Sequence, residues 1–169
     1  MTPAQIRKHS MLNEIATIYR NYGISFHKGK PDRPLSEMAK PLGIRLHLLP
    51  ACTEPFIDHD VLADNKRYTI FHVPQGRDEN RFFCTLLHHY VRIWKDPTRQ
   101  TWQTITSHSL TQTDREAAYA MLYPPKELCS DIRAYMDTDD CIDVKQAAAA
   151  LDLPYDTLHT MLRIYGVID

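Results

Sequence analysis

Two adjacent histidines, His88 and His89, are the side chains of this sequence with the clearest potential for chemistry. They lie in the apolar stretch RFFCTLLHHYV, and two carboxylates, Asp114 and Glu116, follow in a later segment. Imidazole nitrogens and carboxylate oxygens are common zinc ligands in proteins, and a carboxylate can act as general base toward a zinc-bound water. These residue types therefore raise the hypothesis of a metal-dependent hydrolytic site.

The spacing of the two histidines argues against a shared metal ion. A zinc peptidase of the zincin type carries H-E-x-x-H, because residues four apart lie on one face of a helix and direct two imidazoles at one ion. Adjacent residues leave a helix about 100° apart. We therefore expect one of His88 and His89 to face the core and the other to face solvent.

The histidines lie in a segment whose apolar residues recur with the period of a helix. The pattern predicts a largely buried helix from Asn80 to about Trp94. Its apolar positions are Phe82, Phe83, Leu86, Leu87, Tyr90 and Ile93. Cys84 precedes His88 by four residues, but an apolar setting raises the pKa of a thiol, so we expect a structural role for Cys84 rather than a thiol and base pair.

The two carboxylates lie on a second predicted helix, TQTDREAAYAMLYPP, which ends at Pro124 and Pro125. Thr113 is the expected N-cap, and Glu116 is three residues further on, as in a capping box. This pairing explains Glu116 without any metal.

The remaining pattern predicts an α+β fold with a small antiparallel or mixed sheet. Apolar residues alternate over 44–48 and again over 67–74, which indicates two strands, and His72 is expected as an edge residue at the end of the second. Helical spacing indicates an N-terminal helix that ends near Gly23 and a short helix over 126–136. The tail from 143 has the pattern of helix, turn and helix, and 96–110 reads as a polar loop.

Composition excludes several classes of partner. Lys and Arg number 20 against 21 Asp and Glu, so the net charge of −1 gives no overall attraction to nucleic acid or to anionic membranes. No apolar run approaches the roughly 20 residues of a membrane span. The four cysteines form no C-x-x-C pair, so reduced thiols are expected. We expect a cytoplasmic protein with no membrane contact.

The order of these elements resembles that of the ImmA/IrrE family of small zinc peptidases, which occur beside repressors on phages and mobile elements. The central helix of that family reads R-F-x-x-x-H-E-x-x-H, and Arg81 and Phe82 occupy its first two positions. Its ligands and base then fall on Leu86, Leu87 and Tyr90. A leucine side chain can neither bind zinc nor move a proton. If the alignment is shifted by one residue, the family's H-Y ending is matched, but the position of the first zinc ligand then falls on a threonine.

Other segments carry the same resemblance. LSEMAKPLGIRLHLLP is similar to the family's L-A-x-x-L-G-I-x-V, and the helix with Glu116 and Ala117 is similar to its E-A-x-x-F-A-x-x-L-L-M-P. Pro124 lies about one turn closer than in the family, so Asp114 or Glu116 could hold the ligand position. The resemblance implies a zincin-like (minigluzincin) domain over 1–125 and a C-terminal helical segment, 126–169, packed on it as one unit.

The resemblance implies a catalytically inactive metallopeptidase-like protein that binds a partner, a transcriptional repressor or another regulator from a mobile element. No catalytic residue and no cofactor are expected, and His88, His89, Asp114 and Glu116 are vestigial metal candidates. The alternative is an active zinc endopeptidase that cleaves a repressor. It would draw its ligands from those four residues and from a further histidine such as His72 or His108.

A third hypothesis is a DNA-binding regulator that acts through the C-terminal tail. The second tail helix carries His159 and Arg163 among several aspartates. A DNA-reading helix needs cations for phosphates and donors for base edges. The tail is too acidic for this, and a structural or protein-binding role is expected.

Overall fold

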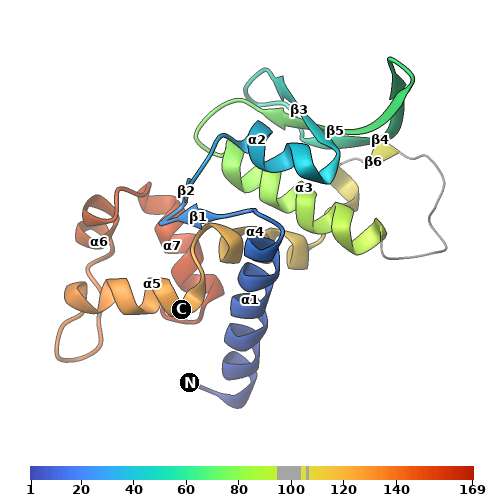
Figure 1. Cartoon of the computed structure of the whole chain (residues 1–169). Helices are drawn as coiled ribbons and strands as arrows, with labels where there is room; N and C mark the ends of the chain where they lie inside the picture. Colours follow the sequence, from blue (N-terminus) through green and yellow to red (C-terminus); the bar gives the residue numbers. More distant parts are fainter. Residues whose placement is uncertain (95–103, 106) are drawn as a thin grey trace.

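The computed structural model describes residues 1–94, 104–105 and 107–169, which form an α+β fold (Figure 1). The helices are α1 (Pro3–Asn21), α2 (Leu35–Ala39), α3 (Glu79–Trp94), α4 (Gln112–Leu122), α5 (Pro125–Asp131), α6 (Val144–Ala150) and α7 (Tyr155–Ile164). The strands are β1 (Phe26–His27), β2 (Lys30–Pro31), β3 (Ile44–Leu49), β4 (Phe56–Ala63), β5 (Lys66–Pro74) and β6 (Thr104–Ile105). The predicted α+β class is confirmed. Most of the segment expected as a polar loop over 96–110 lies outside the described residues.

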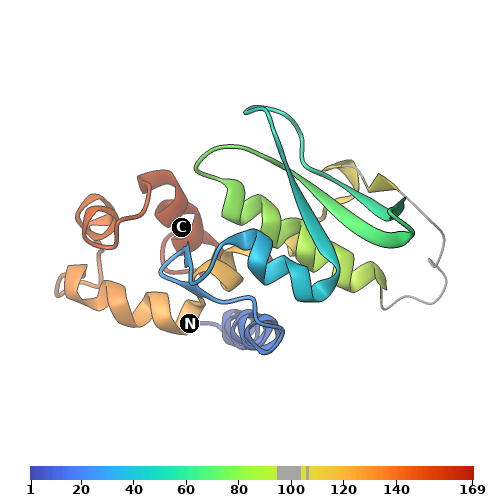
Figure 2. The same ribbon diagram turned by 45° about the horizontal axis from the view of Figure 1, so that its top comes forward.

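The main sheet has the strand order β3-β5-β4-β6 and is mixed. β3 runs parallel to β5, whereas β4 runs antiparallel to both of its neighbours. Thr69, Phe71 and Val73 of β5 are buried on the face that packs on α3. The other face turns away from the helices (Figures 1 and 2). Since β5 lies between β3 and β4, the expectation that His72 is an edge residue is wrong.

The core forms where α3 meets the sheet on one side and α4 on the other. Phe83, Leu86 and Leu87 are fully buried, as the helical period predicted, and Cys84 is fully buried beside them. The α1 helix packs on α4 and begins at Pro3, because Thr2 forms a capping box with Gln5.

The C-terminal helices share this core. The buried Tyr165, just after α7, donates its hydroxyl to the backbone carbonyl of Tyr123 at 2.7 Å. Leu158, Met161 and Leu162 of α7 belong to the same hydrophobic cluster as the α3 leucines. Within the described ranges, no helix is both long enough and apolar enough to cross a membrane.

Candidate functional site

The candidate site is organised by Asp114 in the first turn of α4. Thr111 is the N-cap of this helix: its Oγ1 accepts from the Asp114 backbone N–H at 3.2 Å, and Asp114 Oδ2 accepts from the Thr111 backbone N–H at 2.9 Å. The expected capping box of Thr113 and Glu116 is therefore wrong. The sequence holds T-x-x-D two residues before T-x-x-E, and the first pair starts the helix.

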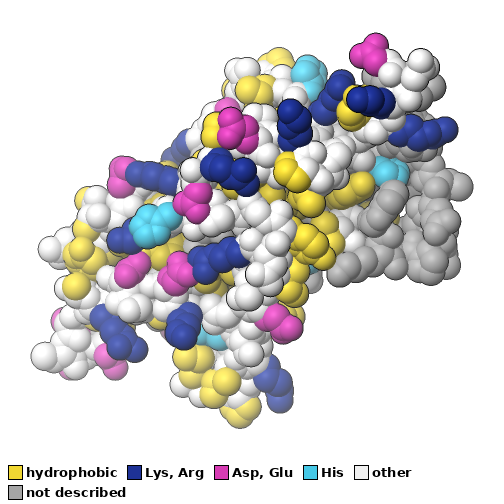
Figure 3. Space-filling model, in the orientation of Figure 1, with side chains coloured by type: hydrophobic (Ala, Val, Ile, Leu, Met, Phe, Trp, Pro, Cys, Tyr) yellow, Lys and Arg dark blue, Asp and Glu magenta, His cyan; other side chains and the backbone are white. Residues whose placement is uncertain are grey.

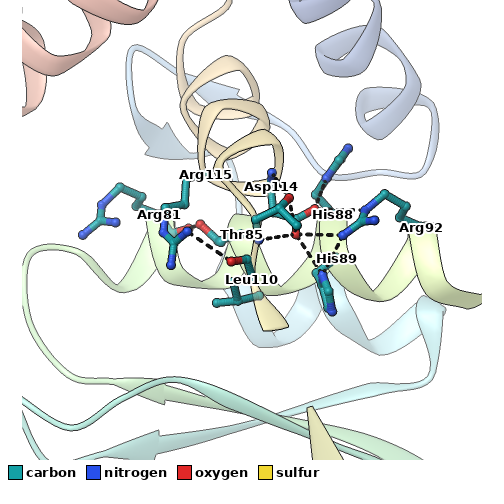
Figure 4. Close-up of polar contacts among 9 residues, drawn as sticks. Arg81, Thr85, His88, His89, Arg92, Leu110, Asp114 and Arg115 are labelled. Atoms are coloured by element: carbon teal, nitrogen blue, oxygen red, sulfur yellow. Dashed lines mark hydrogen bonds and ion pairs between the residues drawn. The ribbon is translucent and has the colours of Figure 1, made fainter. Parts of the chain in front are cut away.

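Asp114 is completely buried and lies against α3 (Figure 4). His88 Nδ1 donates to its Oδ1 at 2.7 Å, and His89 Nδ1 donates to its Oδ2 at 2.8 Å. The Arg92 guanidinium reaches Oδ2 at 3.2 Å, and the Thr111 hydroxyl donates to the same oxygen at 3.0 Å. We call these five residues the Asp114 cluster.

Both histidines turn toward α4, contrary to the expectation that one would face solvent. The side chain of His88 is 13% exposed and that of His89 is 3% exposed. A carboxylate has two oxygens with different directions of approach, so it can accept one hydrogen bond from each of two diverging imidazoles. The two imidazoles still leave α3 in different directions, and the Asp114 carboxylate connects them by accepting one hydrogen bond from each.

The cluster stabilises a charged carboxylate inside the protein. Burial alone would raise the pKa of Asp114, but hydrogen bonds from His88, His89, Thr111 and Arg92 outweigh it and hold that pKa well below its usual range. An ionised carboxylate only accepts hydrogen bonds, so both imidazole Nδ1 atoms carry a proton. The Nε2 atom of His89 is buried and has no hydrogen-bond partner among the described residues.

The residues that the resemblance predicts at zinc-binding positions do not fit a zinc ion. Leu86 and Leu87 are 0% exposed and pack in the core. The Tyr90 hydroxyl lies 3.2 Å from the hydroxyl of Thr69 on β5. None of these three side chains offers the imidazole or carboxylate that the motif requires.

The vestigial candidates come together only in part. His88, His89 and Asp114 meet, but their Nδ1 and carboxylate atoms bind one another instead of converging on a common point. Glu116 lies apart from them and forms an ion pair with Lys8 of α1 at 3.0 Å. In the part of the chain that the structure describes, no three His, Cys, Asp or Glu residues are arranged to hold a metal ion.

The further histidines named for an alternative site also lie elsewhere. His72 contacts Asp58 and His47 on the sheet, and His108 lies exposed in a short turn before α4. The sequence reasoning did not name Arg92 as a partner of the cluster. Its position four residues after His88, one helical turn along the same face, was the available signal.

Comparison with known proteins leaves the chain without a match: no family model, curated protein or solved structure matches it. The fold and the site together define an α+β protein in which a buried aspartate and two histidines link α3 to α4.

Proposed function

We propose that this protein is a catalytically inactive relative of the ImmA/IrrE zinc peptidases, with their zincin-like fold, and that it binds a protein partner in the cytoplasm. The partner is a transcriptional repressor or another regulator from a mobile element, which is held without being cleaved. The observation that carries the proposal is the complete burial of Leu86 and Leu87 where the active family keeps a histidine and a glutamate.

The chemistry of the Asp114 cluster supports the loss of catalysis. A hydrolytic zinc site needs ligands that converge on the ion and a carboxylate that is free to accept a proton. Asp114 already accepts hydrogen bonds from His88, His89, Arg92 and Thr111. Because these hydrogen bonds occupy its oxygens, the carboxylate links α3 to α4 and has no remaining capacity to act as a base. All four cysteines are free thiols, which suits a reducing compartment.

An apolar stripe on α1 supports a protein partner. Met11, Ile18 and Tyr22 are 44%, 41% and 45% exposed, and the partly buried Ile15 lies between them. Their spacing of four, three and four residues places them along one face of the helix over about 16 Å. Figure 3 shows further hydrophobic side chains at the N-terminal end of α1, before the first of these four residues. We call these four residues the α1 stripe, and its matching occupant is an amphipathic helix of the regulator.

Binding is tested by isothermal titration of the purified chain with the product of the adjacent gene, which the proposal predicts to be a helix-turn-helix repressor. We expect a complex that Ile18→Glu abolishes and that Thr17→Glu leaves intact. Thr17 is the exposed neighbour of Ile18, so the two variants add the same charge at adjacent positions. Equal affinity in both variants would remove the α1 stripe from the interface, and no complex with the native chain would remove the proposal.

The alternative function is an active zinc endopeptidase with unusual ligands. The observation that favours it is the convergence of His88 and His89 on one carboxylate, together with the Nε2 of His89, which has no hydrogen-bond partner among the described residues. It requires the hydrogen bonds within the Asp114 cluster to break when zinc enters. The alternative therefore predicts cleavage of the repressor that depends on Asp114.

A further inference from the structure

A second group of histidines lies on the face of the main sheet that turns away from α3. His47 of β3 and His72 of β5 are directly paired in the parallel ladder, and Asp58 lies on the next strand, β4. Three neighbouring strands therefore contribute one side chain each. This group is separate from the Asp114 cluster, which lies between α3 and α4.

The two imidazole rings face each other through the same kind of nitrogen. His47 Nδ1 and His72 Nδ1 are 2.8 Å apart, and His72 Nε2 lies 2.9 Å from Asp58 Oδ2. The ring of Phe56 stacks on the His72 ring with 4.0 Å between centroids and an interplanar angle of 10°. His72 is thus fixed in orientation from two sides, whereas His47 is exposed.

The hydrogen-bond chemistry fixes where the protons are. An ionised carboxylate accepts only, so His72 Nε2 carries a proton and donates it to Asp58. In the neutral ring His72 Nδ1 then has a free lone pair, and the proton in the contact comes from His47 Nδ1. One proton lies between two nitrogens, each of which has a lone pair once that proton leaves.

We propose that His47 and His72 form a binding site for a divalent transition-metal ion of the zinc, nickel and copper class, which takes the place of the proton between their Nδ1 atoms. Imidazole nitrogen is a preferred ligand of these ions. Asp58 does not touch the metal. It holds the far nitrogen of His72, as carboxylates do behind metal-binding histidines.

The dimensions of the pair suit such an ion. Two bonds of about 2.0–2.1 Å at a tetrahedral angle separate the nitrogens by about 3.3 Å. The observed 2.8 Å must therefore open by roughly half an ångström, which rotation of the exposed His47 ring provides. The positions on the solvent side are left to water or to an incoming ligand, so the site is open.

The test is titration of the full chain with Zn²⁺ at neutral pH, followed by calorimetry. We expect one ion per chain in the native protein and no measurable binding in His47→Ala at concentrations that saturate the native chain. His47 is exposed, so this variant keeps its fold. Asp58→Asn retains the site with an affinity about 10- to 100-fold lower, because only the support of His72 is lost.

Two control variants and one spectroscopic measurement distinguish this site from other possible metal ligands. His27→Ala, which removes an exposed histidine of β1, and Cys52→Ser, which removes an exposed thiol, should leave the affinity unchanged. In imidazole NMR spectra we expect added Zn²⁺ to shift the signals of His47 and His72. Zn²⁺ binding that survives His47→Ala would overturn the assignment, and so would NMR shifts confined to His88 and His89. Neither outcome bears on the repressor complex.

Discussion

The most consequential residue of this chain is Asp114. In the sequence Asp114 and Glu116 were equal candidates for the ligand position, because Pro124 lies about one turn closer to Glu116 than the resemblance implies. The structure separates them: Asp114 is buried among four donors, while Glu116 forms a peripheral ion pair with Lys8. Sequence spacing alone could not show that one carboxylate can accept hydrogen bonds from two adjacent histidines, since this depends on how α4 approaches α3.

Replacement of Asp114 tests its structural role. Asp114→Asn removes the charge that faces His88, His89 and Arg92, and the loss of a charged acceptor of buried hydrogen bonds costs about 1.5–3 kcal/mol. The free energy of unfolding, measured in urea, should fall by that amount. Glu116→Gln is the matched control, since a pair near the surface contributes within about 1 kcal/mol. Similar losses in the two variants would contradict the assignment.

The low pKa of Asp114 also predicts how stability depends on pH. The unfolded chain binds a proton at this residue below about pH 3.9, whereas the folded chain does not. The contribution of Asp114 is therefore complete above about pH 5 and is lost as the pH falls through 4 and below, with a slope that approaches about 1.4 kcal/mol per pH unit. Unfolding midpoints measured between pH 5 and 2.5 should show this slope, and Asp114→Asn should flatten it. Parallel curves for the two proteins would be the contrary result.

At the scale of elements, the helices with strong apolar periodicity were predictable and the irregular strands were not. α3 was identified from its apolar positions, whereas β4 was not. The ladder of β4 with β5 shifts register between Asp58 and Val61, and such a bulge breaks the alternation from which a strand is read. The pair of His47 and His72 was missed for a related reason, because a cross-strand contact depends on the register between two distant segments.

The central position of α3 predicts the effect of truncating its leucines. Leu87→Ala should lower the free energy of unfolding by about 2–5 kcal/mol, because it leaves a cavity in the core. Leu48→Ala in β3 removes the same atoms from a side chain that is 45% exposed and should change stability far less. Thermal unfolding of both variants checks this. Equal shifts in melting temperature would mean that α3 is not the centre of the core.

At the scale of the whole molecule, one core extends from the sheet through α3 and α4 to the C-terminal helices. Leu87 and Leu158 belong to the same buried cluster although they come from the central helix and the tail. The sequence indicated each helix of the tail, but only the folded chain shows that Tyr165 reaches the backbone of Tyr123. A tail bound in this way stabilises the domain.

The cysteines report on the integrity of this core. Burial raises the pKa of the Cys84 thiol far above its usual range, whereas Cys52 and Cys141 are exposed. In the folded protein a thiol reagent should therefore modify Cys52 and Cys141 quickly and Cys84 only after denaturant is added. Mass spectrometry of labelled peptides over time checks this order. Labelling of Cys84 as fast as that of Cys52 would show that the core around α3 opens.

The measurement that bears most directly on the proposed function is the intact mass of the repressor after incubation with this chain and Zn²⁺. A non-catalytic binding protein leaves the repressor at its full mass, in a complex that dissociates into two unmodified chains, in the native protein and in Asp114→Asn alike. A repressor cut at a defined peptide bond by the native chain, with the cut absent in Asp114→Asn, would show that the protein is an active peptidase.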